Sequence, residues 1–244
     1  MVVQALLNEN ISSLIPYSFV QVTGRMDGQT LNMIAEFQSR VLNKAKPDGK
    51  IDPGGQTERK LHEGIDSELT RDKLRAIMSN ASDAQINTYL TPLLSAMRTN
   101  QINTPLRMAH FLAQLGHESG DFRYTEEIAD GRAYEGRKDL GNTQAGDGPR
   151  FKGRGLIQLT GRTNYTNYGQ ARGRDFVTPP NNLLLATDAN LAVDVSCWFW
   201  TTHGLNVRAD ADNLNGITRT INGGTNGLAD RAAHLQRAKL LLVP

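Results

Sequence analysis

Hydrophobic positions in the middle of the chain recur at helical spacing. After Thr104 and Pro105, small and apolar side chains follow one, three and four residues apart, at Met108, Ala109, Leu112, Ala113 and Gly116. This spacing places them on one face of a helix. Thr104 suits the N-cap, Pro105 the first helical position, and Gly120 the end. We therefore predict a helix over residues 104–119.

Similar periodicity predicts further helices. They cover residues 30–42, 56–62, 82–94, 187–202 and 228–242. Residues 156–160 instead alternate apolar and polar side chains, which predicts a short extended segment with Gln158 and Thr160 on one face. Residues 130–149 are polar and rich in glycine, so we expect a loop there. The pattern predicts a mainly α fold, with at most a small irregular sheet.

Residues 1–66 are predicted to form a small separate unit of three short helices. An Asp-Gly turn at residues 27–28 leads into the second helix. Residues 46–55 are too rich in proline and glycine for helix or strand, and they contain a second Asp-Gly turn before a helix. The two turns indicate an internal repeat. We expect a linker over residues 67–74 and a larger domain over residues 75–244.

Glu118 lies at the end of the helix predicted for residues 104–119, on a face beside the apolar stripe. A negative charge near a helix C-terminus is slightly unfavourable, so the position needs a reason. Partial burial would favour the protonated form of this carboxyl, as a general acid requires. A solvated residue in the last helical turn is the alternative interpretation.

Other charged residues add to this picture. Further carboxylates follow in the polar stretch, among them Glu126, Glu127 and Glu135. Glycoside hydrolysis needs two carboxylates, of which one protonates the leaving oxygen and the other acts on water or on the sugar cation. Near the start of the last helix, Arg231 meets an unfavourable dipole, so we expect it to have an acidic partner.

Several short motifs follow one another along the chain. They are His117-Glu118-Ser119-Gly120, residues 127–131, 134–137, 141–143 and 151–165, then Ile221-Asn222-Gly223-Gly224 and Ala229-Asp230-Arg231. In this order they resemble the core of family 19 glycoside hydrolases. That family holds plant-type chitinases and the phage or bacterial endolysins that cut peptidoglycan. The resemblance covers residues 75–244.

The resemblance implies a lysozyme-like helical domain and an inverting mechanism. Glu118 would be the general acid and Glu127 the base that activates water, with Glu126 and Glu135 as alternatives for the base. Thr160 would help to hold the water. The resemblance also implies that the side chains of Gln158, Asn164 and Asn222 bind sugar. Arg231 would be an arginine that positions a carboxylate.

Composition narrows the class of protein. The 244 residues are 39% hydrophobic and 21% charged, which suits a soluble globular protein. The formal net charge of +2 does not require nucleic acid, although it favours an anionic polymer such as the bacterial wall. Cys197 is the single cysteine, so internal disulfides are excluded and a buried thiol is expected. His110 and His117 lack a third ligand at metal spacing, so we expect no metal or cofactor.

The N-terminal sequence also bears on location. Residues 1–66 resemble a small peptidoglycan-binding module of three helices. The start of the chain has no charged region followed by a long apolar core, and no run reaches the ~20 apolar residues of a membrane helix. We therefore expect a monomer without a membrane span, made in the cytoplasm and acting on the wall, in the periplasm, after release.

These features favour a muramidase-type endolysin that hydrolyses the β-1,4 bond of peptidoglycan for host cell lysis. A chitinase of the same fold, and an antibacterial toxin delivered by a secretion system, would use the same chemistry. A wall-binding protein that has lost activity is a further alternative. Glu118, Glu127 and Thr160 argue against this last interpretation, because they are the residues that such a protein would not need.

Overall fold

The structure, a computed structural model, describes residues 1–63 and 65–243. Within these residues it contains helices but no β-strand, so the prediction of a mainly α fold is confirmed. The α-helices are α1 (Val2–Glu9), α2 (Gly28–Arg40), α3 (Gln56–His62), α4 (Arg71–Ile77), α5 (Asp83–Thr99), α6 (Pro105–Ser119), α7 (Asp147–Arg150), α8 (Arg162–Arg172), α9 (Leu184–Thr187), α10 (Ala189–Thr202), α11 (Leu205–Asp210), α12 (Leu214–Asn222) and α13 (Leu228–Leu242). The short 3-10 helices are η1 (Ile11–Leu14), η2 (Arg132–Tyr134), η3 (Lys138–Leu140) and η4 (Asn181–Leu183).

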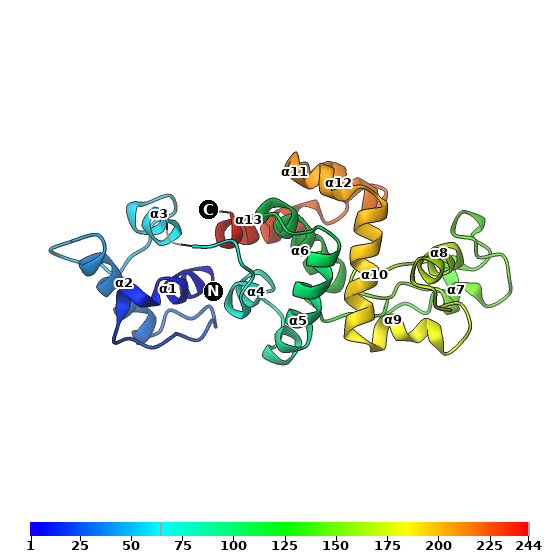
Figure 1. Ribbon diagram of the computed structural model, residues 1–244, viewed down its shortest axis with the longest axis horizontal. Coiled ribbons are helices and arrows are strands. Elements are labelled where there is room, and N and C mark those ends of the chain that lie inside the picture. Colours follow the sequence, from blue (N-terminus) through cyan, green and yellow to red (C-terminus); the bar gives the residue numbers. More distant parts are fainter. Residues whose placement is uncertain (64, 244) are drawn as a thin grey trace.

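The helices form an elongated molecule with α6 and α13 near its centre (Figure 1). Helices α1 to α3 lie at one end, and α7, α8 and α9 lie at the other. Helix α6 packs closely on α13, and α10 packs on α5. Phe111 on α6 meets Trp200 on α10 edge to face, with ring centroids 5.3 Å apart.

Cys197 is buried as expected, and burial raises the pKa of its thiol. No helix in the described residues is both long enough and apolar enough to cross a membrane.

The predicted helix bounds agree with the structure for two helices, and the predicted cap of a third is present. The bounds of α3 and α13 equal the predicted ones. At the start of α6, the Thr104 Oγ1 accepts a hydrogen bond from the Arg107 amide at 3.3 Å. The prediction of a loop over residues 130–149 was incomplete, because this stretch contains the short helices η2 and η3 and the start of α7. These short helices begin or end at glycines with positive φ, namely Gly131, Gly141 and Gly146.

The N-terminal unit uses one arrangement twice. The side chain of the buried Gln4 of α1 accepts hydrogen bonds from two backbone amides of the turn at residues 23–25. It also donates one to a backbone carbonyl of this turn, and the three distances are 2.8 to 3.0 Å. The buried Gln38 of α2 binds the turn at residues 48–50 in the same way, at 2.8 to 3.1 Å. Each turn contains a glycine with positive φ. The internal repeat is therefore present, but its first turn is at residues 23–25 and not at residues 27–28.

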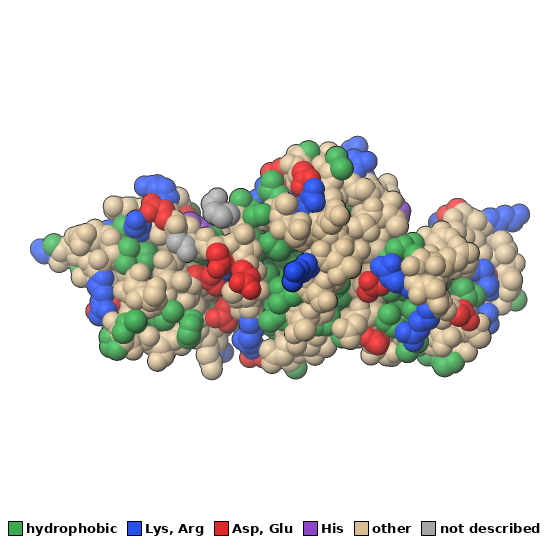
Figure 2. Space-filling view, viewed as in Figure 1, with side chains coloured by type: hydrophobic (Ala, Val, Ile, Leu, Met, Phe, Trp, Pro, Cys, Tyr) green, Lys and Arg blue, Asp and Glu red, His purple; other side chains and the backbone are tan. Residues whose placement is uncertain are grey.

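The junction between the N-terminal unit and the rest of the chain is packed. Helix α4 begins inside the segment predicted as a linker, and α1 contacts it. The Asn8 Nδ2 donates to Asp72 Oδ2 at 2.7 Å. The fully buried Lys73 ammonium lies 3.1 Å from a Glu9 oxygen and 3.2 Å from an Asp66 oxygen. Figure 2 shows acidic side chains gathered near this junction. The limits of the two units remain a prediction.

Candidate active site

Glu118 is the next to last residue of α6. The apolar residues before it, such as Leu112 and Leu115, are fully buried, whereas the Glu118 side chain is 17% exposed. Gly120, with a φ of +56°, ends the helix directly afterwards. The carboxyl group therefore lies at the edge of the core, where one side can meet a substrate. The partial burial expected from the sequence is confirmed.

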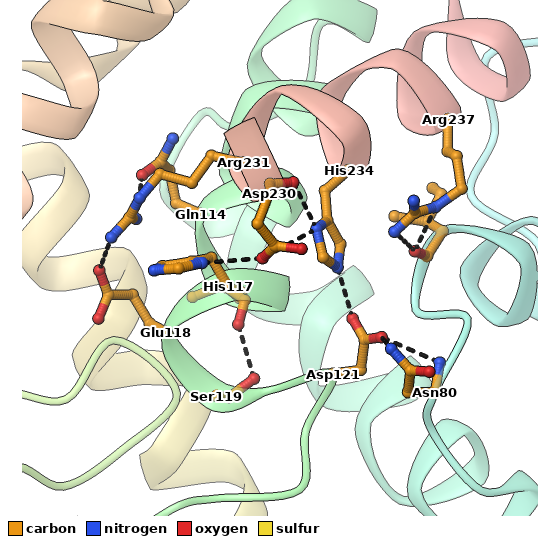
Figure 3. Close-up of polar contacts among 12 residues, drawn as sticks. Asn80, Gln114, His117, Glu118, Ser119, Asp121, Asp230, Arg231, His234 and Arg237 are labelled. Carbon is orange, nitrogen blue, oxygen red and sulfur yellow. Dashed lines mark hydrogen bonds and ion pairs between the residues drawn. The ribbon is translucent and has the colours of Figure 1, made fainter. Parts of the chain in front are cut away.

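Arg231 on α13 has the acidic partner that its position calls for. Its side chain is only 1% exposed, and one guanidinium nitrogen forms an ion pair with the Glu118 carboxylate. Another nitrogen donates to the Gln114 Oε1 at 2.5 Å. Figure 3 shows the Arg231 side chain reaching Gln114 and Glu118, which lie on the same side of it. Because Gln114 and Glu118 are one helical turn apart, Arg231 bridges them and restricts the rotation of the Glu118 side chain.

Two glycines let α6 and α13 approach closely here. A methyl group at Gly116 would lie 2.4 Å from the His234 Cδ2, and one at Gly227 would lie 2.0 Å from the His117 Cε1. Both distances are shorter than any real contact of a Cβ atom. His234 of α13 thus fills the space over Gly116 of α6, and His117 of α6 fills the space over Gly227 at the start of α13.

Glu127 lies on the segment that follows α6. Its Oε1 accepts a hydrogen bond from the Tyr134 hydroxyl at 3.0 Å, and its Oε2 accepts one from the Gly153 amide at 3.1 Å. Burial, followed by the bond to Glu127, raises the pKa of Tyr134. Both donors to the carboxylate are uncharged, whereas the Lys152 ammonium donates to the Glu127 backbone carbonyl at 2.9 Å. Within the described residues no cation pairs with the Glu127 carboxylate itself.

The two neighbouring candidates for the base are bound differently. Glu126 forms an ion pair with Arg154 at 2.8 Å and lies 3.5 Å from the Lys152 ammonium. Glu135 accepts hydrogen bonds from the backbone amides of Gly146 and Gly148, each at 2.7 Å. Glu126 is thus neutralised by two cations, and Glu135 fastens the start of α7.

The segment from residue 156 to residue 160 is a turn and not the extended strand that alternation predicted. Arg154 and Leu159 exchange backbone hydrogen bonds at 3.1 and 2.8 Å, and residues 155–158 form the turn between them. Gln158 therefore takes a φ of +57°. The prediction failed because the pairing of Arg154 with Leu159 reverses the chain within four residues.

Side chains of this turn are linked to one another. The Gln158 Nε2 donates to the Gly155 carbonyl at 3.0 Å, and the Thr160 hydroxyl donates to the Gln158 carbonyl at 3.0 Å. The Asn164 Nδ2 donates to the Thr160 carbonyl at 2.8 Å. A methyl group at Gly153 would lie 2.9 Å from the Gln158 Oε1 and 3.4 Å from the Glu127 Oε2. Gln158 and Glu127 therefore meet over the same glycine.

Asn222, the last residue of α12, holds the turn before α13. Its Oδ1 accepts from the Gly224 amide at 2.9 Å, and its Nδ2 donates to the Asn226 carbonyl at 2.8 Å. The Arg231 Nε donates to the same carbonyl at 3.4 Å. The amide of Asn222 is thus bound within the protein, and its predicted contact with sugar remains a prediction.

The predicted site residues fall into two groups. The acid group is Glu118, Arg231 and Asn222, and the loop group is Glu127, Thr160, Gln158 and Asn164. No hydrogen bond between described residues joins a member of one group to a member of the other.

The sequence interpretation missed two polar partners. Gln114 is fully buried in an apolar helix, four residues before Glu118, and that pattern could have identified it. Tyr134 contacts Glu127 only because the chain turns back through η2, which no local pattern indicated.

The two histidines of α6 contact carboxylates. The His110 Nε2 lies 2.8 Å from an Asp212 oxygen, and the His117 Nδ1 lies 2.8 Å from an Asp230 oxygen. Burial lowers the pKa of His110 despite its bond with Asp212. Both histidines therefore join α6 to other elements through hydrogen bonds.

The sequence is similar to a known protein family and to individual proteins. A family profile described as chitinase class I matches residues 98–227, which include every predicted site residue except Arg231. A Haemophilus influenzae protein described as containing a glycosyl hydrolase family 19 domain is 32% identical over 157 residues, covering 52% of this chain and 75% of its own length. An Arabidopsis thaliana endochitinase is 38% identical over 118 residues, which are 48% of this chain and 39% of that protein.

Solved structures share the fold. Chitinase C from Streptomyces griseus superposes with a TM-score of 0.57 at 22% identity, covering 71% of this chain and 76% of that one. A class IV chitinase from Zea mays superposes with a TM-score of 0.52 at 21% identity, covering 71% and 92%. At this level of identity the likeness concerns the arrangement of the helices alone.

Proposed function

The chain belongs to glycoside hydrolase family 19, and from this premise we propose that it hydrolyses the β-1,4 glycosidic bonds of bacterial peptidoglycan as a muramidase-type endolysin. In this proposal it acts on the wall after release from the cytoplasm and causes host cell lysis. The observation that carries the chemistry is the partly buried Glu118 held by Arg231, with a second carboxylate, Glu127, on a separate loop.

Glu118 protonates the glycosidic oxygen in this proposal, and Arg231 stabilises the carboxylate that remains. Glu127 is the base in this proposal: its carboxylate meets uncharged donors, unlike that of Glu126, and it lies over Gly153 together with Gln158, whereas Glu135 lies over Gly148. Thr160 helps to hold that water. An inverting enzyme needs its carboxyl groups roughly 6.5–9.5 Å apart to leave room for the water.

The sugar-binding roles follow the two groups. Gln158 lies beside Glu127 over Gly153, and Asn164 binds the Thr160 carbonyl just after the same turn, so both would bind the sugar on the side of the base. Asn222 lies beside Arg231 and would bind the sugar on the side of the acid.

Charge favours peptidoglycan over chitin as the substrate. A hollow of about 420 Å³ at α11 and α12 is lined by Arg208 and Arg219. Neither guanidinium has a carboxylate partner in the part of the chain that is described, and the nearby carboxylates along the chain, Asp210 and Asp212, pair with Arg107 and Lys239. The peptide stems of peptidoglycan carry carboxylates, whereas chitin is uncharged. Arg219 is also one helical turn from Asn222.

The N-terminal unit supports the same substrate. It is built from a repeated arrangement of a buried glutamine and a glycine turn, and its sequence resembles a peptidoglycan-binding module. It lies outside the part of the chain that matches the family profile. A unit that holds the wall would raise the local concentration of the glycan at the active site.

A chitinase is the second candidate, since several relatives are described as endochitinases. The two candidate functions can be separated by measuring kcat/KM for peptidoglycan fragments and for chitin oligosaccharides of the same length. We expect the wild-type protein to prefer peptidoglycan, and an amidase that removes the peptide stems should weaken that preference. A higher kcat/KM for chitin would contradict peptidoglycan as the substrate and favour the chitinase.

A further inference from the structure

A second set of polar contacts joins α6 to α13 beside the pair of Glu118 and Arg231. The His234 Nε2 lies 2.7 Å from the Asp121 Oδ1, and its Nδ1 lies 2.9 Å from the backbone carbonyl of Asp230. The other oxygen of Asp121 accepts two hydrogen bonds from Asn80, through its backbone amide and its side chain, both at 2.9 Å. The Asp230 carboxylate contacts His117. Figure 3 shows this chain of contacts running beside the acid group.

The central pair of this network is buried. Asp121 is 1% exposed and His234 is 4% exposed. Asp121 is held with a φ of +58°, a strained conformation for a residue other than glycine. The network borders a hollow of about 290 Å³ that is also lined by Gly116, Arg123 and Tyr124. A conformation of this kind persists only where the surroundings fix it, and here the contacts of Asp121 do so.

The electrostatics favour a charged pair. Burial disfavours the charged imidazolium, but the bonds with Asp121 and with the Asp230 carbonyl outweigh it and raise the pKa of His234. Burial likewise disfavours the Asp121 carboxylate, but His234 and Asn80 lower the pKa of that carboxyl. The other charged groups facing His234 are the Asp230 carboxylate, 3.5 Å away, and Arg237, which opposes protonation.

The position of this pair gives it a role. Asp121 lies just after the end of α6, three residues beyond Glu118, and His234 lies on α13, three residues beyond Arg231, so both partners are close along the chain to the proposed acid and its arginine. We propose that the pair of Asp121 and His234 is a positioning device, which fixes α13 on α6 so that Arg231 meets the Glu118 carboxylate. This inference rests on the proposed role of Glu118 and adds Asp121, His234 and Asn80 as positioning residues.

A double-mutant cycle tests this inference. Asp121→Asn keeps the size of the side chain and removes its charge. We expect it to lower kcat about tenfold, with KM changed less than twofold, because a small misplacement of a catalytic group slows the reaction strongly. In an Arg231→Gln background the same substitution should change kcat less than twofold, since its effect passes through Arg231. Rates are measured on solubilised peptidoglycan and on a chitin oligosaccharide, so that the result does not depend on which glycan is preferred.

A matched control comes from the other end of α6. His110 and Asp212 form another contact between a histidine and a carboxylate, in which burial lowers the pKa of His110 instead of raising it, and Asp212 also contacts α13 through Lys239. Asp212→Asn should leave kcat within twofold of the wild-type value. Equal losses of kcat in Asp121→Asn and Asp212→Asn, or an equal effect of Asp121→Asn in both backgrounds, would overturn the inference. His234→Gln serves as the second variant where Asp121→Asn does not fold.

Two further readouts do not depend on turnover. The NMR signal of the Arg231 Nε–H should shift or exchange faster in Asp121→Asn and stay unchanged in Asp212→Asn; the opposite result contradicts the inference even where no glycan is cleaved. The second readout is stability against pH. Because the pKa of His234 is raised, its stabilising effect is complete below about pH 6.5 and is lost as the pH rises through the folded value. Asp121→Asn should flatten that decline.

Discussion

At the scale of single residues, the two proposed catalytic carboxylates differ in their partners. Glu118 meets the cation of Arg231 and is mostly buried, whereas the Glu127 carboxylate accepts from the Tyr134 hydroxyl and a backbone amide among the described residues. A proton donor gains from a cation that stabilises the charge left behind. A base gains from donors that orient it without neutralising it. The contacts therefore suit the two different roles in the proposed mechanism.

Glu118→Gln should lower kcat by at least ~100-fold, because glutamine cannot donate the proton that the leaving oxygen needs. KM and wall binding should change little, since the amide keeps the shape of the side chain. Initial rates on solubilised peptidoglycan measure the effect, and circular dichroism checks that the fold is kept. Substantial residual activity in a folded variant would sink the assignment of Glu118 as the acid.

The three candidates for the base can be separated by the same substitution. Glu127→Gln should lower kcat by about 100-fold. Glu126→Gln, which releases Arg154, and Glu135→Gln, which weakens the start of α7, should cost stability more than turnover. Parallel kcat and melting measurements on the three variants check this. A larger loss of kcat in Glu135→Gln than in Glu127→Gln would move the base to Glu135.

Among the helices and turns, the sequence predicted best the helix ends that depend on periodicity and on residues at the ends themselves. The bounds of α3 and α13 agree with periodicity, and Thr104 and Gly120 mark the ends of α6 as expected. The turn at residues 155–158 was mispredicted, because backbone pairing of Arg154 with Leu159 overrides the alternation of side chains.

Contacts between distant parts of the chain limit what the sequence can show about the site. That Arg231 would have an acidic partner followed from the helix dipole, but the bridge to Gln114 and the pair of Asp121 and His234 join residues more than 100 positions apart. A single sequence holds no periodic signal for such contacts. The predicted roles in binding sugar and water also depend on a ligand, so they remain predictions.

The close packing of α6 on α13 leads to a prediction for Gly116. Gly116→Ala should lower the free energy of unfolding by about 1–3 kcal/mol and also lower kcat, because the new methyl group displaces His234 and moves α13 away from Glu118. Urea unfolding and initial rates measure the two effects. Gly28→Ala is the control, since no atom lies within 4 Å of the added methyl group at that helical position. A neutral Gly116→Ala would contradict the close approach of the two helices.

At the scale of the whole molecule, the N-terminal unit is docked onto the larger part of the chain. Lys73 on α4 is fully buried, and its ammonium lies between Glu9 of α1 and Asp66. A buried charge is costly unless it keeps its partners. The two units are therefore coupled through this ammonium, and unfolding of one should affect the other.

Glu9→Gln tests this coupling. It should lower the free energy of unfolding by about 1–3 kcal/mol, because the buried ammonium loses one of its two carboxylates. Glu68→Gln is the control: only the backbone of Glu68 contacts Lys73, so the change should stay within about 0.5 kcal/mol. Chemical denaturation gives both values. Equal stability of the two variants would show that the junction does not depend on the contact of Glu9 with Lys73.

Hydrolysis of peptidoglycan by Glu118 and Glu127 can be tested by digestion of the purified polymer, followed by borohydride reduction and mass spectrometry of the fragments. We expect new reduced muramic acid ends without anhydro sugars, because water attacks the bond from N-acetylmuramic acid to N-acetylglucosamine. Reduced glucosamine ends would place the cut at the other bond, and anhydro products would exclude attack by water. Intact peptidoglycan alongside cleaved chitin would contradict the proposed substrate.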